Sequence, residues 1–146
     1  MGSDNPTLGA NHCFGCGPIN PYGLRLKIEE NGDSWQAFFV PEDYHCGWPG
    51  VVHGGVLSTA LDEVMSYIAY GKGLMAVTAR LAIEFKRPCA PGKRLLIRAW
   101  PLKVSRRIVE AQAEIRLEDG TVAATATGKF LILSEEQKKV FGGEHL

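Results

Sequence analysis

The sequence predicts an α+β domain in which an antiparallel sheet packs around a single helix. Three observations predict this architecture. Residues 24–28 alternate between apolar and charged side chains, which is typical of a half-buried strand, and a turn signal and a second strand-like stretch follow them. Residues 54–71 change to apolar side chains at spacings of three and four, which is the period of a helix. Residues 77–133 return to alternation, so strands both precede and follow the helix.

The first expected element is a hairpin. Residues 24–28 alternate leucine and isoleucine with charged residues, and this period of two predicts a strand. The turn signal Asn31-Gly32-Asp33 follows, and residues 35–40 are expected to form the partner strand. Residues 41–52 are rich in turn formers and predict a loop.

The segment from Gly54 to Gly71 predicts one long helix. Its few polar residues leave no broad solvated face, so most of its circumference is expected to be buried. The apolar residues that set the period are Val56, Leu57, Ala60, Leu61, Val64, Met65 and Ile68.

Four strands are expected after the helix, at residues 77–86, 94–104, 107–117 and 121–133. Pro101 cannot donate a hydrogen bond to a neighbouring strand and therefore indicates a sheet edge or a bulge.

The inward positions of the last two predicted strands carry small residues, so the helix can lie close against them. These residues are Ala111, Ala113, Val122, Ala124 and Ala126. Residues 134–146 are polar and predict a solvated tail, which leaves a single domain over 1–146 with its core at about 13–133.

The composition excludes several classes of function. The 146 residues include 16 basic and 16 acidic side chains, so the chain offers no general attraction to nucleic acid or to an anionic membrane. Residues 1–10 lack the features of a leader, and no apolar run approaches the roughly 20 residues of a membrane span. We therefore expect a cytoplasmic protein with no nucleic-acid or membrane partner, whose four cysteines stay reduced.

The predicted loop delivers a histidine and two glycines, His53-Gly54-Gly55, to the start of the helix. The first N–H groups of a helix have no intrahelical acceptors and carry the positive end of its dipole, and glycine lets a ligand approach them closely. The segment can therefore serve as an oxyanion hole. The alternative is an ordinary loop histidine bonded to backbone.

Two carboxylates, Asp62 and Glu63, lie at the centre of the apolar helix. Asp62 follows His53 by nine residues, which is about 13 Å along a helix axis. A buried carboxylate without partners is costly, so these residues require an explanation. Their spacing fits a catalytic role and fits equally a salt bridge or hydrogen bonds across a subunit interface.

The segment Pro49 to Glu63 resembles the signature of hotdog-fold acyl-CoA thioesterases of the phenylacetic-acid-degradation type. The resemblance covers residues 13–133. Further matching segments are Cys13-Phe14-Gly15-Cys16-Gly17, Asn20-Pro21, Gly23-Leu24, Phe85-Lys86-Arg87-Pro88 and Pro91-Gly92.

The resemblance implies a hotdog fold, an antiparallel sheet of five to six strands wrapped around one long central helix. It implies hydrolysis of an acyl-coenzyme A to free acid and CoA, without a cofactor. The site is expected between the subunits of a homodimer that can pair into a homotetramer.

The resemblance also implies site residues. Asp62 is expected to act as general base or nucleophile, the Gly54 N–H to polarise the thioester carbonyl, His53 to brace the loop or the thioester, and Thr78 to orient water. The residues expected to bind substrate are Gly55, His45, Ser66 and Glu63. For Glu63, a structural role in a partner salt bridge or a backbone hydrogen bond is the favoured interpretation.

One departure from the family concerns Gly47, where many relatives carry Asn or Gln. His45 can substitute for that side chain, although a solvated loop histidine is the favoured interpretation. The departure also supports an alternative function, a non-catalytic acyl-CoA-binding hotdog protein. A hotdog hydratase or dehydratase acting on an enoyl or hydroxyacyl thioester is the third interpretation.

Cys13-x-x-Cys16 has the spacing of half a zinc site, which His12, or His45 with Cys46, can complete. The alternative is a packed N-terminal turn with two small apolar thiols. We favour the packed turn and expect no metal.

Overall fold

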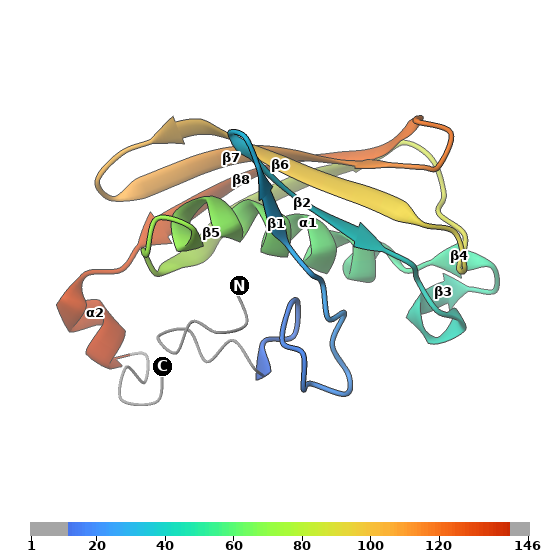
Figure 1. The fold of residues 1–146 in the computed structure, drawn as a ribbon, viewed down its shortest axis with the longest axis horizontal. Coiled ribbons are helices and arrows are strands. Elements are labelled where there is room, and N and C mark those ends of the chain that lie inside the picture. The colour runs from blue at the N-terminus through green and yellow to red at the C-terminus, as the bar shows by residue number, and fades with distance from the viewer. Residues whose placement is uncertain (1–11, 141–146) are drawn as a thin grey trace.

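The computed structural model describes residues 12–140, and the N-terminal residues 1–11 and the end of the predicted tail, 141–146, lie outside the described residues. Six strands form one antiparallel sheet in the order β1-β2-β6-β7-β8-β5, and a two-stranded sheet pairs β3 with β4 (Figure 1). The elements are β1 Glu29–Asn31, β2 Ser34–Phe39, the 3-10 helix η4 Asp43–His45, β3 Cys46–Trp48, β4 Val51–Val52, α1 Gly54–Tyr70, β5 Ala76–Phe85, β6 Leu95–Val104, β7 Ile108–Arg116, β8 Val122–Ile132 and α2 Glu135–Val140.

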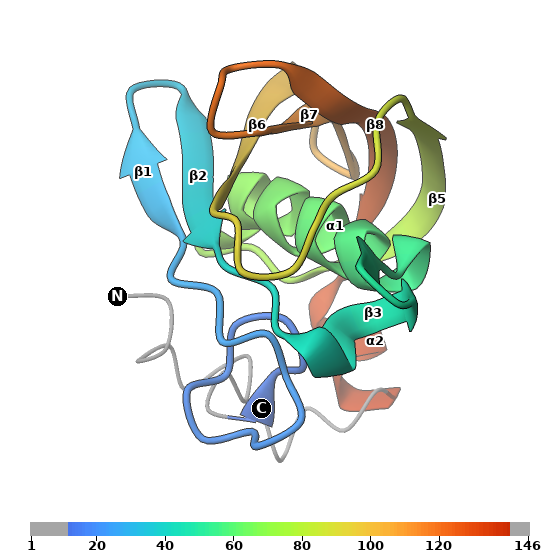
Figure 2. The same cartoon turned by 90° about the vertical axis from the view of Figure 1, so that its right-hand side faces the viewer.

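The six-stranded sheet curves around α1, which runs along its concave face (Figure 2). The segment that precedes β1 passes on the other side of the helix, so α1 lies between the sheet and the N-terminal segment (Figures 1 and 2). This arrangement confirms the predicted antiparallel sheet around one helix.

The burial of α1 confirms the prediction from its apolar period. From Leu57 to Tyr70 no residue is exposed, and Ala60, Leu61, Val64 and Met65 are fully buried. The sheet offers small residues beneath it, and Gly128 on β8 shows how close the approach is. A Cβ at Gly128 would lie 2.8 Å from the Phe130 ring and 3.1 Å from the Met65 methyl carbon. Small side chains are therefore a condition of this packing.

Residues 24–28 differ from the predicted strand. Leu24, Leu26 and Ile28 are buried as the alternation indicates, but the segment lies outside the sheet. The Leu24 and Leu26 N–H groups donate to the carbonyl oxygens of Phe14 and Gly15, at 2.9 and 3.0 Å. The N-terminal turn thus takes hydrogen bonds that a neighbouring strand would otherwise receive, and the strand β1 begins only at Glu29.

The later strands follow the predicted segments within one or two residues, and β6 is irregular where it contains Pro101. Its register against β7 shifts between Pro101 and Lys103, so the bulge is confirmed. The predicted loop 41–52 is more ordered than expected, because it contains η4 and the β3–β4 pair.

The predicted solvated tail contains a short helix, α2, none of whose residues is buried. The Gln137 N–H donates to the Ser134 hydroxyl, and the Ser134 N–H donates to the Gln137 amide oxygen. This reciprocal pair is a capping box, and the spacing Ser-x-x-Gln is visible in the sequence. Among the described helices, none is long and apolar enough to cross a membrane.

Candidate active site

The start of α1 carries one N–H group that has no partner. His53 is the residue before the helix, and its Nδ1 accepts a hydrogen bond from the Gly55 N–H at 2.8 Å. The Val56 and Leu57 N–H groups donate to the His53 carbonyl oxygen. Within residues 12–140 no acceptor reaches the Gly54 N–H. The His53 side chain thus accepts the hydrogen bond of the Gly55 N–H and leaves the Gly54 N–H free to bind a ligand oxygen.

A cavity of about 290 Å³ opens beside this unpaired N–H. Gly54 and Leu57 line it from α1, and the segment after β5 contributes Lys86 and Arg87, both of which are exposed. Two cations therefore lie next to the positive end of the helix dipole. Neither Lys86 nor Arg87 was predicted as a site residue from the sequence. Their position as a basic pair at the end of a predicted strand could have indicated a binding role.

Asp62 lies in the middle of α1 and points toward β5, the edge strand of the sheet. The Thr78 hydroxyl donates to Asp62 Oδ1 at 2.7 Å. Burial raises the pKa of the Asp62 carboxyl, and the Thr78 hydrogen bond opposes that rise. A carboxylate with a raised pKa holds a proton more tightly and is a stronger base.

The predicted catalytic residues form two separate groups within one chain. His53 and Gly54 lie at the start of α1, and Asp62 with Thr78 lies at its centre. Gly54 and Asp62 are eight residues apart, which is about 12 Å along a helix axis. One chain therefore does not bring the unpaired N–H and the carboxylate to the same atom of a substrate.

Glu63 points away from Asp62, toward the N-terminal turn. The Cys13 thiol donates to Glu63 Oε2 at 3.4 Å, and Glu63 is mostly buried. Burial, followed by the nearby Cys13, raises the pKa of the Glu63 carboxyl to about 8. The Ser66 hydroxyl donates to the Glu63 carbonyl oxygen at 2.6 Å. Sequence reasoning missed the contact between Glu63 and Cys13, because 50 positions separate them.

The interpretation of His45 as a solvated loop residue is wrong. Its side chain is buried, with only 9% of its surface exposed, and its ring packs against Phe39 and Tyr44. The Glu42 N–H donates to His45 Nδ1 at 2.9 Å. The histidine is inside because it completes a capping arrangement at η4 and has aromatic neighbours on both sides.

Gly47 lies against the His53 ring. A Cβ at this position would approach His53 Cδ2 to 3.1 Å, so a side chain here would require the ring that caps α1 to shift by a few tenths of an ångström. Glycine accommodates the observed position of His53 without that shift.

The sequence model of the thioesterase superfamily matches residues 49–124, slightly more than half of the chain. The matched segment contains the β4–α1 junction, the whole of α1 and the edge strand β5. The chain belongs to the thioesterase superfamily. The predicted family is thereby confirmed.

A curated relative agrees with this assignment. A bovine (Bos taurus) protein named acyl-coenzyme A thioesterase THEM4 is 31% identical over 118 residues, which are 79% of this chain and 48% of that protein. The chain thus spans about half the length of that curated relative.

Two solved structures share the fold of this thioesterase superfamily member. A crystal structure of a thioesterase superfamily protein is 28% identical, with a TM-score of 0.76, over 82% of this chain and 63% of that one. A mutant structure of the phenylacetic acid degradation protein PaaI from Thermus thermophilus is 26% identical, with a TM-score of 0.69, over 75% of this chain and 95% of that one. These neighbours confirm the hotdog fold.

Proposed function

We propose that the chain hydrolyses the thioester of an acyl-coenzyme A to a free acid and CoA. The observation that carries the proposal is the unpaired Gly54 N–H at the start of α1, beside a cavity that Lys86 and Arg87 line. A tetrahedral intermediate places negative charge on the former carbonyl oxygen, and a fixed N–H at a helix start stabilises that charge. The two basic side chains match the phosphate groups of CoA.

Asp62 supplies the second half of the reaction. Acting as a base, its carboxylate takes a proton from water while the water oxygen bonds to the thioester carbon. Acting as a nucleophile, it forms an anhydride that water then opens. In both routes the carbon–sulfur bond breaks and CoA leaves as a thiol after taking up a proton. The Thr78 hydroxyl holds Asp62 Oδ1 and fixes the direction of the other oxygen.

We further propose that the site is shared between two copies of the chain. The separation of about 12 Å between Gly54 and Asp62 requires a second helix start near Asp62. Within residues 12–140, strand β5 pairs with β8 on one side only, and its residues from Val77 to Arg80 are exposed. A ten-residue edge strand with an open side is suited to a twofold interface. The proposed assembly is a homodimer, with pairing into a homotetramer as a further step.

The remaining predicted site residues support this arrangement without taking part in the chemistry. His53 and Gly55 fix the helix start through the bond from the Gly55 N–H to Nδ1. His45 holds the preceding loop, because its carbonyl oxygen accepts from the His53 N–H at 2.9 Å. Ser66 and Glu63 line a separate cavity beside the N-terminal turn.

The proposed location is the cytoplasm. Cys13, Cys16, Cys46 and Cys89 are all free thiols, which fits a reducing compartment. The name of the bovine relative, acyl-coenzyme A thioesterase, supports acyl-CoA as the substrate.

The test is an assay of CoA release with short, medium, long and aromatic acyl-CoAs. The proposal expects free thiol to appear with at least one of them, at a rate proportional to protein concentration. The alternative is a non-catalytic acyl-CoA-binding protein, which the glycine at position 47 supports. It predicts saturable binding of acyl-CoA with no thiol release. Calorimetric titration with the same acyl-CoAs separates the two outcomes.

A further inference from the structure

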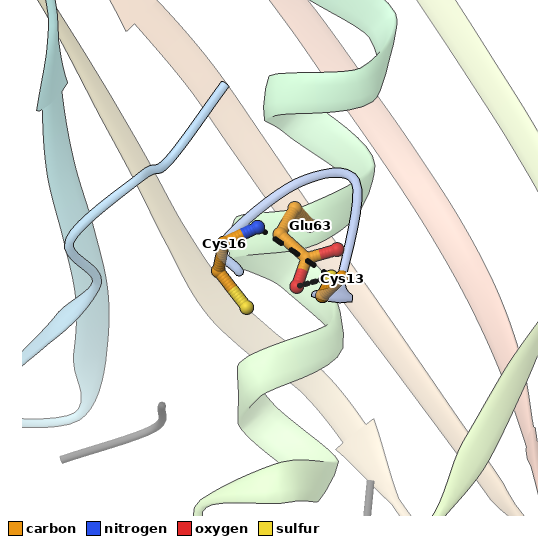
Figure 3. Close-up of side chains that lie close together, drawn as sticks. All are labelled: Cys13, Cys16 and Glu63. Carbon is orange, nitrogen blue, oxygen red and sulfur yellow. Dashed lines mark hydrogen bonds between the residues drawn. The ribbon is translucent and has the colours of Figure 1, made fainter. Parts of the chain in front are cut away.

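The N-terminal turn and α1 bring two thiols and a carboxylate together at a place that the proposed hydrolysis does not use. Cys13 and Cys16 lie in the turn, and Glu63 extends from α1 between them (Figure 3). One ligand atom from each residue, two sulfurs and a carboxylate oxygen, lies within 4.8 Å of the other two. From the turn and this carboxylate we infer a zinc site formed by Cys13, Cys16 and Glu63.

One of the separations between ligand atoms already matches that around a tetrahedral ion. With zinc–sulfur bonds of about 2.3 Å and zinc–oxygen bonds of about 2.0 Å, two ligand atoms of a tetrahedron lie about 3.5–3.8 Å apart. The Cys13 Sγ is 3.4 Å from Glu63 Oε2, so this pair needs almost no adjustment. The spacing Cys-x-x-Cys is also the one that zinc turns use.

The backbone of the turn holds the Cys13 sulfur in place. The Cys16 N–H donates to Cys13 Sγ at 3.4 Å. Hydrogen bonds from the Leu24 and Leu26 N–H groups fix the other side of the turn. The thiolate is the form of cysteine that binds zinc.

Gly15 allows the carboxylate to come this close. A Cβ at Gly15 would lie 2.5 Å from both Cγ and Oε1 of Glu63. The backbone of the turn therefore rests directly on the Glu63 side chain, and only glycine permits that contact.

The cluster lacks a positive charge. Across residues 12–140 the ion pairs are Arg116 with Glu114 and Lys138 with Glu135, so no basic side chain compensates Glu63. A divalent ion would supply that positive charge, and the three ligands would release their protons on binding it.

The fourth position of the ion is open to water. A cavity of about 80 Å³ adjoins the three groups and is also lined by Ser66 and Tyr67. The Tyr67 hydroxyl lies 3.1 Å from Cys16 Sγ, close enough to hydrogen-bond a water on the metal. Three protein ligands and one water is a coordination set that zinc adopts in proteins.

Zinc at this place would fasten the N-terminal turn to α1 at the residue next to Asp62. It would also neutralise the Glu63 carboxylate beside the proposed catalytic one. The sequence favoured a packed turn without metal, and considered His12, or His45 with Cys46, as completing ligands. The structure brings none of these three side chains into the cluster, because the carboxylate that completes it comes from α1.

The experiment measures metal in the full-length protein, purified under reducing conditions and without a histidine tag. The chain is incubated with zinc chloride, dialysed, and analysed by plasma mass spectrometry. We expect about one zinc ion per chain. Cys13→Ser and Cys16→Ser should each lose at least about nine-tenths of the bound zinc, because one ligand of three is removed. Cys46→Ser, the same change at a thiol outside the cluster, should keep it.

Cobalt provides a readout that needs no variant. Co²⁺ bound tetrahedrally by two thiolates gives sulfur-to-metal absorption in the near ultraviolet and strong visible bands, and we expect both in the wild-type chain. A wild-type chain that holds less than about a tenth of an ion after dialysis contradicts the site. Equal zinc in Cys16→Ser and wild type, or a Cys13–Cys16 disulfide in place of metal, contradicts it as well. None of these results depends on CoA release, so the proposed function can fail or stand separately.

Discussion

Asp62 and Glu63 are neighbours on one helix, yet their surroundings differ in nearly every respect. Asp62 faces the open edge strand β5 and accepts one hydrogen bond, from the Thr78 hydroxyl. Glu63 faces the N-terminal turn and lies beside the thiols of Cys13 and Cys16. Burial raises the pKa of both carboxyls, to about 8 for Glu63.

The difference shows that the elements packed against α1, rather than α1 itself, determine what each carboxylate can do. Two adjacent helical residues point about 100° apart. On one side lies an edge that a second copy of the chain can cover, and on the other lies the chain's own turn. The first arrangement suits a reacting group, and the second suits a bound metal ion.

The largest expected effect comes from removing the unpaired N–H. Gly54→Pro deletes that donor at the first position of α1, where proline is tolerated, and His53 already has the extended backbone that precedes proline (φ −60, ψ 134). Turnover should fall about 100- to 1000-fold, as for loss of an oxyanion donor.

Gly54→Ala is the matched control, because it keeps the N–H and adds a Cβ 3.5 Å from the Phe85 ring, an ordinary contact. Its turnover should fall far less, by about threefold or less. Equal losses of turnover in the two variants, with unchanged circular dichroism, would show that the Gly54 N–H does not contribute to catalysis.

Substitutions at Asp62 and Glu63 distinguish the roles of the two carboxylates. Asp62→Asn should lower kcat by about 100-fold or more, because an amide neither accepts the proton nor attacks the thioester. Glu63→Gln should change kcat by about threefold or less, since this side chain faces the turn. The reverse order of losses in a CoA-release assay would show that the roles are exchanged.

Substitutions at Thr78 test how the proposed catalytic carboxylate of Asp62 is positioned. Thr78→Val keeps the shape of the side chain and removes the hydroxyl that bonds Asp62 Oδ1. A hydrogen bond to a charged group is worth about 1.5–3 kcal/mol, so kcat should fall about tenfold or more. Thr78→Ser keeps the hydroxyl and should recover most of the rate. If the serine variant is as slow as the valine variant, the hydrogen bond is not what matters.

His45 is a third buried titratable group, and its pKa moves in the opposite direction. Burial lowers the pKa of His45 below its usual value near 6.5, and the nearby Glu42 opposes that shift only in part. The unfolded chain therefore binds the proton more tightly, and stability present above pH 6.5 is lost as the pH falls below it. Urea unfolding at several pH values should show a shallower acid loss in His45→Gln than in wild type. Parallel curves for the two proteins would assign the acid loss to other groups.

The elements with a clear period were predictable from the sequence, whereas those that depend on distant partners were not. The apolar period of α1 and the alternation in β7 lie within single segments and needed no other information. Residues 24–28 alternate in the same way but bond the N-terminal turn, which no local pattern reveals. The helix α2 was predictable from the spacing of Ser134 and Gln137 and was overlooked.

The candidate site was predictable to the same limited extent. The glycines at a helix start and the carboxylates at its centre are visible as spacing, and resemblance singled out Asp62 and Thr78. Which glycine N–H remains unpaired depends on where the His53 ring points, and spacing does not give that. The contact of Glu63 with Cys13 joins segments 50 residues apart and appears only when the chain is folded.

Mixing two inactive chains shows directly whether two copies share one site. If Asp62 of one copy acts with Gly54 of the other, a heterodimer of Asp62→Asn and Gly54→Pro chains contains one site with both groups intact. Free exchange at equal amounts should then restore roughly a quarter of the wild-type rate of CoA release, since half of the dimers are mixed and each has one working site of two. Activity that stays at the sum of the two separate variants, with exchange shown by mass spectrometry, would contradict a site shared between two copies.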